Sequence, residues 1–306
     1  MWIVARKYGQ LANRLFLFAN LIGAARHYGV ELRNPCFAEY ADWFPSTRYD
    51  LWCRYRAHLE QASTPESCEH EHSLARPERP SLRKRNALMG AVSTGSKLLC
   101  SVGLSSKPFR IVQLKSGEHC DLLGEGFQTH AESKQSLLLR GWLFRSPLIM
   151  DHRVPICEYF SLDHSDQKKI NEHLDRCRQD SDLVVGVHIR RGDYKTFQGG
   201  RYFYDDADYA NWMHSVQEQV APRRVRFLVC SQEPPSVDHF DGLRITPGPG
   251  SARLDLYSLA ETDWMIGPPS TFTAWAAYYG LKPRVELTSS EMQFVPPVLP
   301  ADQVAA

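Results

Sequence analysis

The stretch 183–194 reads Leu-Val-Val-Gly-Val-His-Ile-Arg-Arg-Gly-Asp-Tyr. Its apolar, β-branched first half predicts a buried strand, and Gly192-Asp193 marks a turn at the carboxyl end of that strand. Ligands of open α/β sheets bind outside the carboxyl ends of the strands, so two adjacent guanidinium groups there are placed to meet an anion such as phosphate. Because side chains alternate across a strand, His188 and Arg190 share one face while Arg191 points to the other. We therefore expect Arg190 to be the principal ligand contact.

A purely structural explanation of this segment also exists. The charged strand end can simply pair with Asp193 or with water, without any ligand. The tripeptide Arg191-Gly192-Asp193 also matches a cell-adhesion signal, but a turn at this place requires the glycine in any case. The segment therefore needs support from elsewhere in the chain.

Composition describes an ordinary globular protein. The chain has 306 residues, of which 43% are hydrophobic and 23% are charged, enough to bury a sizeable core in two domains. The formal net charge of +1 argues against a broad basic surface for nucleic acid or for an acidic membrane. Eight cysteines are scattered without a Cys-x-x-Cys pair, which favours reduced thiols. With no basic-then-apolar leader and no apolar run of membrane-spanning length, we expect a cytoplasmic protein whose only membrane contact would be peripheral.

Residues 1–150 predict an amino-terminal α/β domain. Residues 2–6 have the pattern of a strand, 7–12 of a glycine-containing loop and 13–27 of an amphipathic helix, in which Asn13 is a cap or first-turn residue. Further strands are expected at 30–32, 109–114 and 137–142. Residues from about 56 to 88 are rich in Pro, Glu, Arg, His and Ser, which predicts an irregular insertion. A linker is expected near 146–163.

Residues 151–306 predict a second α/β domain with a parallel sheet. After the strand at 183–189, helical patterns at 206–220, 254–261 and 270–279 alternate with strand patterns at 226–230, 243–245, 264–267 and 284–287. The junction Pro268-Pro269-Ser270-Thr271 places two hydroxyls and the first free backbone N–H groups of a helix at a strand end. Ser270 can also be only a helix cap. Two anion-binding features on one sheet make the ligand site the better explanation.

Several rival motifs carry less weight. Asp206-Ala207-Asp208 has the spacing of a divalent metal site in some glycosyltransferases, but acidic residues also favour a helix start. Cys68, His70 and His72 would share one face of an extended segment and could chelate a metal, although a solvated loop explains them better. The segment 90–97 nearly spells a phosphate-binding loop, but Ser96 replaces the required lysine. We expect no metal.

Motifs along the chain resemble those of the α-1,2-fucosyltransferase family. The resemblance rests on the glycine loop at 9–16 (Gly-Gln-Leu-Ala-Asn-Arg-Leu-Phe), the Gly-aromatic segment at 139–144, the His-x-Arg-Arg-Gly-Asp segment at 188–193, Phe-Leu-Val-Cys-Ser at 227–231 and Ser-Thr-Phe-Thr-Ala-Trp-Ala-Ala at 270–277. The α-1,6- and protein O-fucosyltransferases share the His-x-Arg-Arg core. The motifs follow one another in the family's order and leave only residues from about 56 to 136 without a counterpart.

The resemblance implies a GT-B-like α/β fold, in which two Rossmann-type domains face each other across a cleft. It implies that residues 1–150 form the acceptor-side domain and that residues 151–306 form the domain that binds the nucleotide sugar GDP-fucose. It implies that Arg190 binds the β-phosphate of GDP-fucose and that His188 lies against the ribose or pyrophosphate, with Asp193 near the phosphate. It further implies that the nucleotide sugar is contacted by a set of other residues, namely Gly9, Asn13, Asp255, Ser270, Thr271 and Phe272. Asp255 would accept from guanine. Asp193 is better explained as orienting Arg190 than as a general base, and Glu233 is a second candidate for the base.

The glycine loop departs from the family pattern Gly-Gly-Leu-Gly-Asn-Gln. Gln10, Ala12 and Arg14 stand at three of these positions, which removes backbone freedom and adds a cation.

The function that the sequence predicts is inverting, metal-independent transfer of fucose from GDP-fucose to a glycan hydroxyl in an α-1,2 linkage, in surface-polysaccharide synthesis. Alternatives are a transferase for another nucleotide sugar and a non-catalytic protein that binds sugar nucleotides or glycans.

Overall fold

The computed structural model divides the chain into two compact units, Met1–Asp163 and His164–Ala306. It describes residues 1–57, 78–101, 109–133, 135–233 and 237–297. The sequence places the division after residue 150, within the linker that it predicts at 146–163. In the structure this stretch contains α4 (Leu148–Asp151) and α5 (Arg153–Tyr159), which contact α1 (Leu11–His27) in the first unit.

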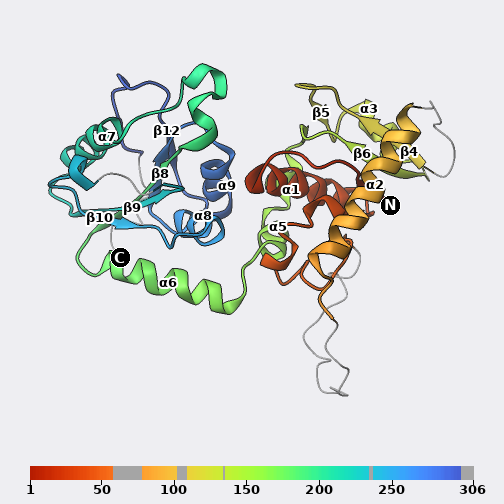
Figure 1. The fold of residues 1–306 in the computed structure, drawn as a ribbon, viewed down its shortest axis with the longest axis horizontal. Coiled ribbons are helices and arrows are strands. Elements are labelled where there is room, and N and C mark those ends of the chain that lie inside the picture. The colour runs from red at the N-terminus through yellow and green to blue at the C-terminus, as the bar shows by residue number, and fades with distance from the viewer. Residues whose placement is uncertain (58–77, 102–108, 134, 234–236, 298–306) are drawn as a thin grey trace, which may run out of the picture. The chain divides into compact units, whose positions relative to one another are not determined.

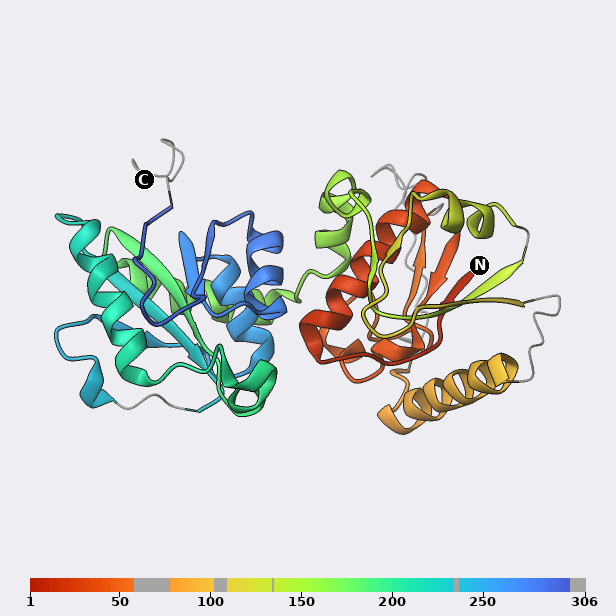
Figure 2. The same cartoon turned by 90° about the horizontal axis from the view of Figure 1, so that it is seen from above.

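The first unit is built on a five-stranded sheet in the order β3-β2-β1-β6-β4. All neighbours in it are parallel except β2 and β3. Its strands are β1 (Trp2–Val4), β2 (Glu31–Arg33), β3 (Arg54–Arg56), β4 (Phe109–Gln113) and β6 (Ser136–Arg140). A separate pair, β5 (Cys120–Asp121) and β7 (Phe144–Arg145), and helix α3 (Glu125–Ala131) complete the unit. Helices α1 and α2 (Leu82–Ser101) lie on opposite sides of the sheet (Figure 2), and α2 packs Val92 and Leu99 against Ile3 and Leu138.

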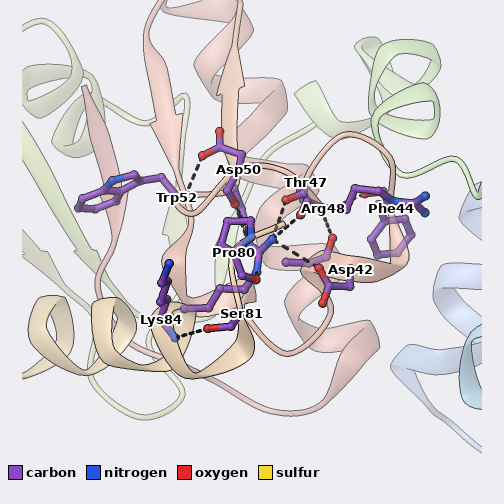
Figure 3. Close-up of polar contacts among 12 residues, drawn as sticks. Asp42, Phe44, Thr47, Arg48, Asp50, Trp52, Pro80, Ser81 and Lys84 are labelled. Atoms are coloured by element: carbon purple, nitrogen blue, oxygen red, sulfur yellow. Dashed lines mark hydrogen bonds and ion pairs between the residues drawn. The ribbon is translucent and has the colours of Figure 1, made fainter. Parts of the chain in front are cut away.

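Helix α2 corrects the expectation of an irregular insertion from 56 to 88. It begins at Leu82, inside that range, while residues 58–77 lie outside the described residues. The helix is fixed at its start by the buried Arg85, which donates to the backbone oxygens of Asp50 (2.7 Å), Arg48 (2.7 Å) and Pro80 (3.2 Å). Figure 3 shows these carbonyl-bearing residues facing the first turn, where Ser81 Oγ accepts from the Lys84 N–H. Because a polar side chain occupies a buried position of α2, the helix has only a weak apolar stripe. The helical periodicity of its sequence is therefore weak as well.

The second unit contains an all-parallel sheet in the order β10-β9-β8-β11-β12. The strands are β8 (Leu183–Ile189), β9 (Val225–Ser231), β10 (Ile245–Pro247), β11 (Trp264–Gly267) and β12 (Arg284–Glu286). The helices are α6 (His164–Arg178), α7 (Asp206–Gln219), α8 (Ala252–Ala260) and α9 (Thr271–Gly280). Helix α7 covers one face of the sheet, and α8 and α9 lie on the other (Figure 1). Each helical crossover returns the chain to a parallel strand, as the alternating sequence pattern predicts.

Burial explains why β8 forms the centre of this sheet. All seven of its residues are buried, and Val185, Val187 and Ile189 join the core with Tyr209 and Trp212 of α7. On the opposite face, Gly186 leaves room for Leu259 of the α8 side, since a Cβ there would lie 2.7 Å from the leucine side chain. A strand covered on both faces reads as a continuous apolar run, which is the signal in the sequence.

Two further features concern the cysteines and the length of the helices. The cysteines among the described residues are free thiols, and Cys68 lies outside those residues. None of the described helices combines the length and the apolar character needed to cross a bilayer.

Candidate active site

The candidate site lies where the strand order of the second unit reverses. The chain starts in the middle of the sheet at β8, continues outward through β9 and β10, and then returns to β11 and β12 on the other side of β8. The carboxyl ends of β8 and β11 therefore border the switch point, the usual ligand site of a doubly wound sheet. β8 is followed by Arg190, and β11 leads through two prolines into α9.

His188 is the last residue but one of β8, and it is almost fully buried at 5% exposure. Its ring stacks on Phe272 of α9, with centroids 4.8 Å apart and planes 23° from parallel. Burial, and after it the charge of Arg190, lowers the pKa of His188 to about 3. Its Nδ1 is buried and has no hydrogen-bond partner among the described residues. A neutral imidazole with an unused ring nitrogen can hydrogen-bond a ligand, but it is too weak a base to accept a proton at neutral pH.

Arg190 projects from the end of β8 with 13% of its side chain exposed. Its Nη2 donates to both carboxylate oxygens of Asp193 at 2.9 and 3.2 Å, and its guanidinium lies 4.9 Å from the ring centre of Tyr194. The Nε is buried without a partner among the described residues. A buried donor left unpaired in this way is costly unless something accepts from it. The structure thus places Asp193 beside Arg190 as an orienting carboxylate.

Arg191 has a different environment. It is buried on the α7 side, where Nη1 donates to the backbone oxygen of Tyr204 and Nη2 pairs with Asp206. Its guanidinium also lies over the rings of Phe203 and Tyr209, at 5.5 and 5.7 Å. The alternation predicted from the sequence is therefore observed, and Arg191 holds α7 and the loop before it against the sheet.

The amino terminus of α9 forms the other side of the site. Ser270 is the N-cap, and its Oγ accepts from the Phe272 N–H at 3.1 Å. The capping explanation of Ser270 therefore holds, and the donors left for a ligand are the N–H and hydroxyl of the half-buried Thr271. Gly267, at the end of β11, allows the close approach of β8, because a Cβ there would lie 3.1 Å from the His188 oxygen.

Two residues that the sequence did not single out brace this helix start. The Tyr194 hydroxyl donates to the Pro269 oxygen at 2.6 Å, which ties the loop after β8 to the loop after β11. Arg284 Nη1 donates to the Ser270 oxygen and to Thr273 Oγ1 at 3.1 and 3.2 Å. Tyr194 follows directly on the Gly192-Asp193 turn, so the sequence does indicate that it lies beside the site. Arg284 gives no local signal, because its partners are 11 to 14 residues away in the chain.

Asp255 lies in the first turn of α8, next to the ends of β9 and β10. It is buried at 8% exposure, and its Oδ1 accepts from the Gly250 N–H at 2.9 Å. Burial raises the pKa of Asp255 to about 6, against the opposing backbone N–H groups of Gly250 and Ser251. Gly248 is needed here, since a Cβ would lie 2.8 Å from Oδ1. A buried carboxylate is an acceptor of the type that recognises a paired N–H edge, such as that of guanine.

Gly9 and Asn13 belong to the first unit, in the loop between β1 and α1. Gly9 has a φ of +59°, and a Cβ at that position would come within 2.3 Å of Asn13 Nδ2, so only glycine fits. Asn13 lies in the first turn, whereas the N-cap position is Gln10, without a side-chain cap. Arg14 is buried, donates to the Gly9 oxygen at 3.1 Å and pairs with Glu39 at 3.0 Å. The cation that the sequence adds to this loop is thus neutralised within the unit.

The two aspartates of the rival metal motif, Asp206 and Asp208, have other roles in the structure. Asp206 pairs with Arg191, and Asp208 forms a capping box with Asp205 at the start of α7. Within the described part of the chain no group of three or more His, Cys, Asp or Glu side chains is arranged to hold a metal ion. His70 and His72 lie outside that part.

Comparison with known proteins identifies one family model and several solved structures that are similar to this chain. Residues 156–294 match the family model of glycosyl transferase family 11. A structure of FUT1 from Arabidopsis thaliana in complex with GDP is 15% identical, with 92% of this chain and 69% of that one covered and a TM-score of 0.53. POFUT1 in complex with GDP-fucose is 11% identical, with 94% and 97% covered and a TM-score of 0.54. No curated protein matches the sequence. The fold is GT-B-like, and the chain is a glycosyltransferase.

Proposed function

We propose that this chain, whose residues 156–294 match the family model of glycosyl transferase family 11, transfers fucose from GDP-fucose to a hydroxyl group of a glycan with inversion. The observation that carries the proposal is the meeting of three features at one switch point: a guanidinium with a buried unpaired Nε, a neutral buried histidine and a helix amino terminus. Together they suit a pyrophosphate. The GDP and GDP-fucose in the complexes named above support the choice of donor.

Each site residue has a proposed role in this reaction. Arg190 binds the β-phosphate, His188 contacts the ribose or pyrophosphate, and Thr271 supplies the helix-end donors. Ser270 caps the helix through the Phe272 N–H, and the Phe272 ring supports His188. Asp255 accepts from the N1–H and N2–H of guanine. The motif resemblance assigns Gly9 and Asn13 to the nucleotide sugar as well. The α-1,2 linkage and a role in surface-polysaccharide synthesis are proposed from the motif resemblance.

Catalysis follows from the charge that develops on the leaving group. As the bond between fucose and the β-phosphate breaks, negative charge grows on the phosphate oxygens, and a fixed guanidinium with helix-end N–H groups stabilises that charge more than it stabilises the ground state. Asp193 is a positioning residue in this scheme because both of its carboxylate oxygens accept from Nη2 of Arg190. A donor that ionises early needs little help from a base.

The proposed mechanism needs no metal ion, which a binding experiment tests. We expect GDP and GDP-fucose to bind in calorimetry with EDTA present, and GDP-fucose to be hydrolysed or transferred under the same conditions. A ligand at about one hundred times its Kd also adds roughly 2.7 kcal/mol to the free energy of unfolding, which a thermal-shift panel of nucleotide sugars detects. Binding only after Mg²⁺ or Mn²⁺ is restored contradicts the metal-free mechanism. Stronger stabilisation by another nucleotide sugar contradicts the choice of fucose.

A further inference from the structure

A second group of cations lies in the amino-terminal unit, at the carboxyl ends of β1 and β6. These two strands are parallel neighbours, and the Ala5 N–H donates to the Leu139 oxygen at 2.9 Å. Arg6 therefore leaves the sheet beside Arg140, the last residue of β6. This edge carries the glycine loop and is the edge where a doubly wound sheet binds its ligand.

Arg140 is buried at 6% exposure without a carboxylate partner among the described residues. Its Nη1 donates to the Ser93 oxygen at 3.2 Å and to Ser96 Oγ on α2. Its Nε is buried and has no acceptor within the described part of the chain. A guanidinium taken out of water without a counter-charge is unfavourable, and an unpaired N–H adds to that cost. Both costs are offset if an anion binds here.

The neighbours of Arg140 add positive charge. The Arg6 guanidinium lies 5.0 Å from the ring centre of the half-buried Tyr8, and Arg6 and Arg140 both oppose the rise in the pKa of Tyr8 that burial causes. Lys7 and Arg14 are close as well, but both pair with Glu39. Among the described residues, Arg6 and Arg140 therefore have no carboxylate that compensates their charges.

We propose that this edge binds the acceptor through an anionic group, and that the acceptor is an acidic sugar of the hexuronic acid class whose carboxylate pairs with Arg140 and Arg6. The inference rests on the proposed function and names its acceptor. The pyrophosphate of the donor already has partners in Arg190 and α9, so the two cations of the first unit are available for a second anion. The exposed side of Tyr8 provides an aromatic surface on which a sugar ring can pack.

Two probes that differ at one group test the proposal. Methyl β-D-galacturonide and methyl β-D-galactoside differ only by a carboxylate in place of a hydroxymethyl group, and each is titrated into the full chain in saturating GDP by ligand-observed NMR. Saturating GDP keeps the donor's phosphate contacts occupied. We expect the galacturonide to bind about tenfold more tightly, as one charge-assisted hydrogen bond provides, and the preference to shrink as salt is raised.

Three variants locate the preference. Arg6→Gln and Arg140→Gln should each reduce the preference for the acid to less than about threefold. Arg6 is exposed, so its variant remains informative if Arg140→Gln fails to fold. Arg56→Gln is the matched control, since Arg56 is an exposed arginine of β3 that pairs with the first residue of β2, at the opposite edge of the same sheet.

The outcomes separate this inference from the proposed function. If GDP does not bind, the proposed function is wrong. If GDP binds but both probes bind equally, if neither probe binds up to its solubility limit, or if Arg56→Gln removes the preference as well, the acidic acceptor is wrong. If Arg6→Gln and Arg140→Gln weaken GDP and leave the sugar preference intact, the cations serve the donor and the inference is also overturned.

Discussion

Replacing Arg190 with lysine is expected to lower turnover about a hundredfold while leaving the fold intact. Lysine keeps the positive charge but loses the planar fork that can meet two phosphate oxygens at once. Losing one such contact to a departing phosphate costs on the order of 3 kcal/mol in the transition state, which corresponds to the stated factor in kcat. The folded state loses little, because Asp193, the ion-pair partner of Arg190, is 57% exposed and such pairs contribute under about 1 kcal/mol.

The neighbouring Arg191→Lys variant should show the opposite behaviour. Arg191 donates to the Tyr204 oxygen, pairs with Asp206 and packs over Phe203, all in buried surroundings. A lysine cannot reach both acceptors, so one buried partner is left unsatisfied and the free energy of unfolding should fall by about 2 to 3 kcal/mol. For a unit of this size that lowers the Tm by several degrees. Well below the transition, we expect kcat within about threefold of the parent protein.

The two variants are compared by steady-state transfer from GDP-fucose and by differential scanning calorimetry, with the Kd of GDP measured in parallel. The expected pattern is a crossed one, with activity lost in Arg190→Lys and stability lost in Arg191→Lys. An equal loss of kcat in both variants would refute the assignment of Arg190 to the phosphate. So would parent-level activity in Arg190→Lys.

Two further expectations follow from buried charges. Because Asp255 has its pKa raised to about 6, the native state holds this proton more tightly than the unfolded chain, so the free energy of unfolding should fall as the pH rises from about 4 to 6. Asp255→Asn should remove that fall, adding no more than about 3 kcal/mol at pH 7, and should weaken GDP binding, which calorimetry at pH 5 and 7.5 checks. Arg85→Gln should lower the free energy of unfolding in urea by about 3 kcal/mol, since it strips donors from buried carbonyls, whereas the exposed Arg83→Gln should change it by less than about 0.5 kcal/mol.

The sequence predicts most strands of both sheets because their signals are local. The strand β8 is an apolar run ended by a Gly-Asp turn, and β11 is an apolar run ended by two prolines. The strand β3 escapes prediction because Arg54-Tyr55-Arg56 is an edge strand whose only described ladder partner is β2. Helix α2 escapes because Arg85 and Ser96, not an apolar stripe, are its buried residues.

For the candidate site, strand alternation alone separates Arg190 from Arg191. The local pattern cannot supply contacts that close over long sequence separations. Tyr194 reaches Pro269 across 75 residues, and Arg284 reaches back to the start of α9. The low pKa of His188 is caused first by burial and then by the charge of Arg190, and the burial, to which the stacked Phe272 contributes, is not visible in the segment around residue 188. The face of the sheet to which each arginine points is therefore predictable here, whereas the protonation of His188 and the bracing of α9 are not.

Arg14 shows why a residue type alone does not fix a local charge. Its place in the glycine loop suggests a cation added next to the donor, yet the side chain is buried, paired with Glu39 and bonded to the Gly9 oxygen. The hydrogen bond from Arg14 to the Gly9 oxygen thus adds rigidity to a loop in which Gln10 already replaces a second, more flexible glycine. The charge of Arg14 is not available to a phosphate. The uncompensated charge at this edge comes instead from Arg6 and Arg140, which lie outside the loop. An arginine is available to a ligand only if no carboxylate of the protein pairs with it. Which carboxylates lie near it depends on how the sheet brings the strand ends together.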